Sequence, residues 1–108
     1  MPNTMLLVLC TCPDEGSARG LSESLVQEKL AACVSIVNPI SSTFTWQGRI
    51  DSEQESLLLI KTTETAYSAL EQAIKQRHPY EVPEIIAIPI QRGSAEYTNW
   101  IRENTCTD

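Results

Sequence analysis

Short apolar runs and stretches with helical spacing alternate along this chain of 108 residues, in an order that few folds accommodate. Residues 5–12 form an apolar run that ends at Pro13, which is typical of a buried strand. The apolar residues Leu21, Leu25, Leu30 and Ala32 then recur at near-helical spacing. The predicted strands cover residues 5–12, 34–46, 55–63 and 84–90, and the predicted helices cover residues 17–33, 65–77 and 94–104.

The order β-α-β-β-α-β, followed by a helix, predicts an α+β fold of the ferredoxin-like, split βαβ kind. Its helices cover one face of a four-stranded antiparallel sheet. The length favours a single domain over residues 1–108. Residues 43–63 are expected to form a long hairpin that turns near Gly48. Trp46 and Trp100 are too apolar to be left uncovered on the open face, so we expect self-association.

The charge balance excludes one class of partner. The chain has 14 acidic against 8 basic residues, a net charge of -6, and a general nucleic-acid binder needs the opposite sign. The apolar run at residues 5–9 is too short for a membrane span or a signal peptide. We therefore expect a cytoplasmic protein whose thiols are reduced. The cysteines are Cys10, Cys12, Cys33 and Cys106. On a strand, Cys10 and Cys12 would point to the same face.

The segment from His78 to Glu84 holds the only histidine of the chain between a predicted helix and a predicted strand. Pro79 and Pro83 each push the residue before them out of the helical region, so this corner is expected to be stiff and extended. It has two interpretations. His78 suits the end of a helix, where a cation meets the negative pole of the dipole. An imidazole in a stiff turn also suits a binding site.

Several motifs together carry a family resemblance that covers nearly the whole chain, from about residue 5 to residue 104. In combination they resemble the CutA (divalent-cation tolerance) family. The motifs are Leu9-Cys10-Thr11-Cys12-Pro13-Asp14, Glu28-Lys29-Leu30-Ala31-Ala32-Cys33-Val34, Trp46-Gln47-Gly48-Arg49-Ile50, Leu59-Ile60-Lys61-Thr62-Thr63, His78-Pro79-Tyr80-Glu81-Val82-Pro83-Glu84 and Tyr97-Thr98-Asn99-Trp100-Ile101.

The resemblance implies a homotrimer in which the long hairpin packs against neighbouring subunits, a cytoplasmic location, and a link to copper and other divalent metals without a known enzyme activity. It also implies copper ligands, namely a cysteine that matches Cys10 and a pair of histidines of which the second matches His78. The first histidine position is Arg77, which does not ligate metals. By chemistry alone, the substitutes are Glu84, Cys12 and Cys33. Buried free cysteines are more often inert core thiols.

Two other functions occur on this fold. An acylphosphatase needs an anion cradle after the first strand, but residues 11–16 place acidic side chains there, which argues against this enzyme. A nucleotide-sensing signalling trimer that resembles the nitrogen-regulatory proteins is the alternative. We predict a metal-linked binding protein without catalysis. The candidate phosphate contacts of the alternative are Lys61, Arg49, Arg77 and Arg92.

Overall fold

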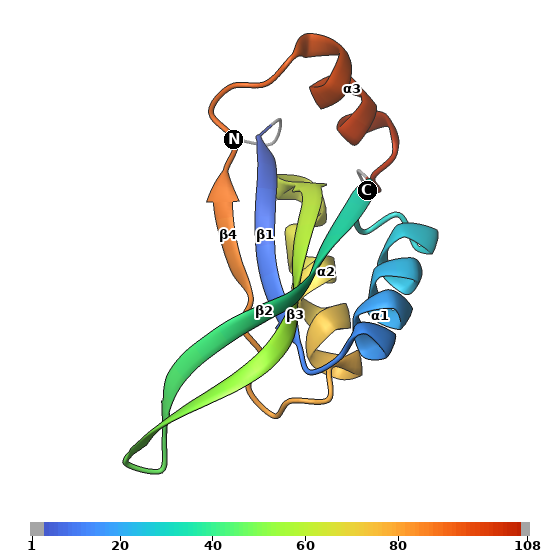
Figure 1. Cartoon of the computed structure of the whole chain (residues 1–108). Coiled ribbons are helices and arrows are strands. Elements are labelled where there is room, and N and C mark those ends of the chain that lie inside the picture. The colour runs from blue at the N-terminus through green and yellow to red at the C-terminus, as the bar shows by residue number, and fades with distance from the viewer. Residues whose placement is uncertain (1–3, 107–108) are drawn as a thin grey trace.

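The fold is a four-stranded sheet with two helices, α1 and α2, on one of its faces and a third helix, α3, beyond one end (Figure 1). The computed structural model describes residues 4–106. In this range no helix is long and apolar enough to cross a membrane. The elements are β1 (Met5–Cys12), α1 (Glu15–Gln27), β2 (Cys33–Trp46), β3 (Arg49–Thr63), α2 (Glu64–Arg77), β4 (Ile86–Pro89) and α3 (Ala95–Glu103).

The strand order confirms the predicted topology. The strands lie in the order β2-β3-β1-β4, and every neighbouring pair is antiparallel. This is the split βαβ arrangement, in which each helix connects two parallel strands that are separated by a third. Strand β1 is central and largely buried because its residues 5–12 are almost entirely apolar. Its carboxyl end therefore leads from the core to the surface.

The first helix ends earlier than predicted. Asp14 caps its start by accepting a hydrogen bond of 2.7 Å from the Ser17 amide. The expected extension to residue 33 is wrong, because Lys29 adopts a left-handed conformation with φ 60°. The amides of Leu30 and Ala31 then both return to the Leu25 carbonyl, at 2.9 and 3.3 Å, which closes the helix. The strand predicted at residues 84–90 is likewise shorter.

The long hairpin of β2 and β3 confirms the prediction and extends it. Gln47 and Gly48 form its two-residue turn with φ 51° and 78°, the positive values that a tight hairpin turn requires. Trp46 consequently pairs with Arg49. The pairing register shifts between Val37 and Ile40, next to a cis peptide bond before Pro39. In Figure 1 the hairpin projects well beyond the rest of the sheet.

The core lies between the sheet and the helices α1 and α2. Successive side chains of a strand point to opposite faces, so Cys10 and Cys12 both point into this core, as their spacing predicts. The opposite face of the sheet is also apolar. Its half-buried and exposed members include Leu9, Leu59 and Ile86, which are neighbours by strand register. The core side chains with almost no exposure include Val8, Cys10, Leu58, Ile60, Leu25, Leu70 and Ile74.

Candidate metal site at the end of the first strand

Two thiols and the single imidazole meet where β1 ends. The sulfur atoms of Cys10 and Cys12 and a ring nitrogen of His78 all lie within 4.8 Å of one another. Both cysteines are fully buried, and His78 is 8% exposed. Helix α2 ends at Arg77 and the backbone of His78 is extended, so the ring turns toward β1. The tertiary structure thus joins the two sequence-predicted ligands, Cys10 and His78, and adds Cys12.

The hydrogen bonds of His78 define its protonation. The backbone amide of Tyr80 donates to Nδ1 at 3.0 Å, so Nδ1 carries a lone pair. The Nε2 atom lies 2.7 Å from the Thr11 carbonyl oxygen, which can only accept, so the ring proton lies on Nε2. The Cys12 sulfur is 3.7 Å from the same nitrogen. The ring therefore presents an N–H, and not a lone pair, at the end where the thiols lie.

The two thiols differ in acidity because their sulfur atoms lie close together in a buried place. The contact with Cys12, followed by burial, raises the pKa of the Cys10 thiol far above its usual range. The neighbouring Cys10 thiol in turn lowers the pKa of Cys12. Cys12 is thus the sulfur that loses its proton first. Thiolates are the ligands that soft cations prefer, so this pair suits Cu(I) or Zn²⁺.

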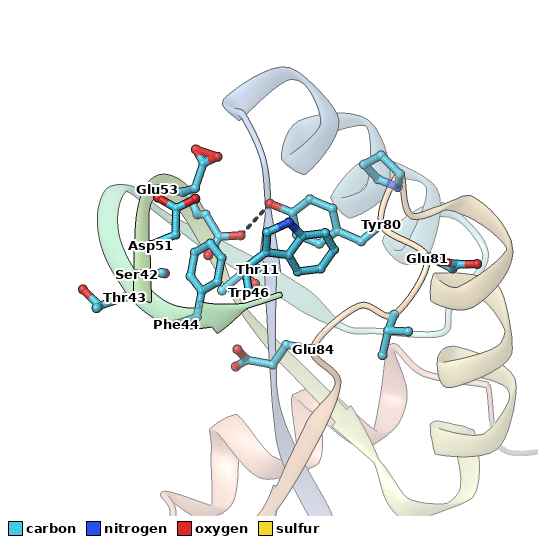
Figure 2. A pocket seen from close by; sticks show the side chains of 13 residues that line it. Thr11, Ser42, Thr43, Phe44, Trp46, Asp51, Glu53, Tyr80, Glu81 and Glu84 are labelled. Atoms are coloured by element: carbon cyan, nitrogen blue, oxygen red, sulfur yellow. Dashed lines mark hydrogen bonds between the residues drawn. The ribbon is translucent and has the colours of Figure 1, made fainter. Parts of the chain in front are cut away.

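Glu84, the weaker candidate ligand, lies in a different place. It lines a pocket of about 980 Å³ between the hairpin and the proline corner, which Figure 2 shows from close by. Thr11 and Tyr80 also line this pocket, so it adjoins the thiol–imidazole cluster without including the thiols. The pocket is strongly acidic. Its carboxylates are Asp51, Glu53, Glu55, Glu81 and Glu84.

Tyr80 connects the pocket to the cluster. Its hydroxyl donates a hydrogen bond of 2.6 Å to Glu55 on β3, drawn as a dashed line in Figure 2. Burial, the Glu55 carboxylate and nearby charges raise the pKa of Tyr80. The Tyr80 and His78 rings lie 4.9 Å apart. Sequence reasoning missed both Tyr80 and Glu55, because no local pattern links residues that are 25 positions apart.

Two of the cationic side chains singled out in the sequence, those of Arg77 and Lys61, have their partners outside this cluster. Arg77 forms an ion pair of 2.9 Å with Glu28 and also donates to Ser24 on α1, so its side chain reaches the neighbouring helix. Lys61 donates to the Ser35 hydroxyl at 2.8 Å and to a backbone carbonyl. It is therefore engaged on β2 and β3 instead of reaching the pocket that Glu84 lines.

These features define a class: a ferredoxin-like α+β protein with a buried thiol–imidazole cluster at the end of its first strand. The family model of the CutA1 divalent ion tolerance protein matches residues 6–104. The chain therefore belongs to this family.

Several members of this family are similar to the chain in both sequence and fold. The divalent-cation tolerance protein CutA of Thermus thermophilus is 50% identical over 99 residues, covering 92% of this chain and 96% of that protein. The crystal structure of CutA1 from Oryza sativa is similar with a TM-score of 0.93 at 40% identity, covering 95% and 94% of the two chains. A protein described as the periplasmic divalent cation tolerance protein CutA, from Archaeoglobus fulgidus, has a TM-score of 0.90 at 36% identity, covering 93% and 97%.

Proposed function

We propose that this chain contributes to tolerance of divalent cations by binding a soft metal ion, copper foremost, at the cluster of Cys10, Cys12 and His78, whose two cysteines hold the ion. The observation that carries the proposal is the convergence of three buried ligand atoms within 4.8 Å. The family of the chain, whose members are named for divalent-cation tolerance, supports the same role. Sulfur and imidazole nitrogen form the donor set that suits Cu(I) and zinc, whereas calcium and magnesium prefer oxygen.

The residues of the site would contribute unequally. Cys12 has the lowered pKa and supplies the first thiolate, and Cys10 follows once a cation offsets the cost of its burial. The bound metal would supply positive charge that holds both sulfurs as thiolates. His78 stands beside them but directs a proton, and not a lone pair, toward its neighbours. We therefore assign the core of the site to the two cysteines.

Titration of the fully reduced protein with Cu(I) under a competing chelator tests the proposal. Cys10→Ser and Cys12→Ser should each weaken binding by at least tenfold, since each removes a soft ligand. Cys106→Ser changes an exposed cysteine outside the cluster and serves as the matched control. Equal affinity in the original protein and all three variants would exclude this site.

The nucleotide-sensing alternative receives less support. Of its four candidate phosphate contacts, Lys61 bonds to Ser35 and Arg77 pairs with Glu28. The large pocket is lined by carboxylates, which repel an anionic phosphate. A thermal shift with nucleotides, compared with the shift produced by Cu(I), separates the two functions. Stabilisation by a nucleotide and none by Cu(I) would favour the alternative.

We further propose that the chain binds without catalysing a reaction. A cysteine beside a histidine is also the arrangement of a nucleophile and its base. Here the His78 nitrogen nearest Cys12 carries its proton to the Thr11 carbonyl, so it has no lone pair with which to accept one from the thiol. When both are incubated with thiol-reactive ester substrates, the original protein should release product no faster than the Cys12→Ser variant does.

The site is proposed to work within a homotrimer. The sheet face opposite the helices exposes apolar side chains, and half of Ile86 is accessible in the single chain. The hairpin tip leaves 61% of Trp46 and 80% of Ile50 accessible, which is unusual for side chains of this size. A second and third copy of the chain would cover these surfaces. Sedimentation of a stably folded monomer at micromolar concentration would exclude the trimer.

The proposed compartment is the cytoplasm. The support is chemical: Cys10 and Cys12 are buried free thiols that lie close together, and a reducing compartment preserves such thiols. Cell fractionation of a tagged protein tests the location. Recovery with periplasmic or extracellular markers would contradict it.

A further inference from the structure

Both ring nitrogens of His78 are already engaged within the protein. Nδ1 accepts from the Tyr80 amide at 3.0 Å, and Nε2 donates to the Thr11 carbonyl at 2.7 Å. A histidine binds a metal through a nitrogen lone pair, and its other nitrogen then carries the proton. Nδ1 cannot take that proton while it faces the Tyr80 N–H. The arrangement that brings His78 to the thiols is thus one in which it is not a ligand.

The hydrogen bond of Tyr80 to Glu55 holds this arrangement in place. Glu55 is a buried carboxylate on β3, and its 2.6 Å hydrogen bond anchors the Tyr80 side chain. The anchored residue presents its backbone amide to His78. Because hydrogen bonds to charged groups are stronger than neutral ones, this contact stabilises the whole corner.

We propose that Tyr80, anchored by Glu55, is a positioning residue that locks His78 in the tautomer whose Nε2, the nitrogen nearest the thiols, carries a proton and cannot bind a metal. The inference rests on the proposed function only where it concerns metal binding. While the His78 proton stays on Nε2, only the two sulfur atoms of the cluster can bind a metal. His78 joins it only after the Tyr80 amide and the Thr11 carbonyl release the ring. Tyr80 thereby sets the affinity of the site without contacting its ligand.

The lock has a readout that needs no metal. His78 is the only histidine, so ¹⁵N labelling of histidine gives signals from one ring alone. In the metal-free protein, Nε2 should show a pyrrole-type shift with a slowly exchanging proton, and Nδ1 a pyridine-type shift. Tyr80→Phe removes the hydroxyl and keeps the amide, so exchange of the Nε2 proton should become faster. The control Tyr67→Phe removes another carboxylate-bonded hydroxyl, that of Tyr67 with Glu71 on α2.

Binding of Zn²⁺ alone supplies the second readout. Loosening the corner lowers the free energy needed to release His78, so Tyr80→Phe should bind Zn²⁺ about tenfold more tightly than the original protein. Glu55→Gln keeps a weaker neutral hydrogen bond and should lie between the two. On Zn²⁺ saturation of Tyr80→Phe, the proton should move from Nε2 to Nδ1. Glu55→Gln also decides the matter if Tyr80→Phe does not fold.

The outcomes separate the lock from the proposed metal site. A pyridine-type Nε2 in the metal-free protein overturns the lock, and so does unchanged Nε2 proton exchange in both Tyr80→Phe and Glu55→Gln. Failure of the original protein to bind Zn²⁺ or Cu(I) overturns the metal site. The ¹⁵N signals of His78 in the metal-free protein still test the positioning role of Tyr80 in that case. Equal Zn²⁺ affinity in Tyr80→Phe and the original protein refutes the role of Tyr80 in setting affinity.

Discussion

Arg77, the last residue of α2, forms a two-pronged ion pair with Glu28, the residue that caps the end of α1. Its two terminal nitrogens each lie 2.9 Å from a carboxylate oxygen. The next residue, His78, instead contacts Thr11 at the end of β1. Two consecutive side chains thus contact different parts of the molecule. Arg77, at the position where the family resemblance implies a second histidine, connects α2 to α1.

The orientation of Arg77 leads to the first prediction. Arg77→His should leave the Cu(I) affinity unchanged within twofold, because a side chain at this position reaches α1. It should slightly lower the melting temperature at low salt, since it removes a pair that is partly exposed. Chelator competition and melting curves at low and high salt check both effects. An increase of tenfold in Cu(I) affinity would show that position 77 does reach the cluster.

The second prediction concerns alkaline unfolding. Burial and Glu55 raise the pKa of Tyr80 in the folded chain above its ordinary value of 10.0. Its neutral form is thus favoured by folding, so this contribution is complete below pH 10 and declines as the pH rises toward the folded pKa. Tyr80→Phe should be less stable at pH 7 by about 1.5–3 kcal/mol, the value of a hydrogen bond to a charged group.

Urea unfolding of both proteins at several pH values checks this prediction. Between pH 10 and 12 the stability of the original protein should fall more steeply than that of Tyr80→Phe, so the two curves should converge. Tyr67→Phe controls for loss of a hydroxyl at the surface of α2. Parallel curves over this range would contradict a raised pKa for Tyr80.

A third prediction tests the core beneath the site. Leu58 is fully buried on β3 and pairs by register with Cys10. Leu58→Ala should lower the free energy of unfolding by about 2–5 kcal/mol, because the truncation leaves a cavity between sheet and helices. Val26→Ala on α1 is the control, since 41% of that side chain is accessible. Equal losses in the two variants would place Leu58 outside the core.

The fourth prediction concerns the hairpin tip. The double variant Trp46→Ser, Ile50→Ser should shift the protein from trimer toward monomer in sedimentation at micromolar concentration, because it removes two large apolar surfaces. Val26→Ser, an exposed apolar change on α1, should leave the trimer intact. A trimer of undiminished stability in the double variant would place the subunit contact elsewhere.

Local patterns predicted most of the fold, and their failures have local causes. The apolar run of β1 predicted its strand, and the alternation of a strand predicted that Cys10 and Cys12 share a face. The end of α1 was predicted at residue 33 because Leu30 and Ala32 continue the apolar spacing. A left-handed Lys29 overrides that spacing and closes the helix.

Only part of the candidate site could be predicted from the sequence. Cys10 and His78 stood out by residue type and by family resemblance, and the structure brings them together. Glu84, the weaker candidate, stood out by chemistry alone and lies in the acidic pocket. The hydrogen bond between Tyr80 and Glu55 could not be predicted from the sequence, because the two residues are 25 positions apart on segments that meet only in the folded chain.

The order of strands and helices, the shared face of the two cysteines and the family can all be read from the sequence, because periodicity and motifs are properties of neighbouring residues. Which nitrogen of His78 carries the proton is fixed only in the folded chain. That choice depends on the Thr11 carbonyl, 67 positions away, and on the Tyr80 amide, both placed by folding. A hydrogen bond requires distance and direction, and these arise only when distant segments are packed together.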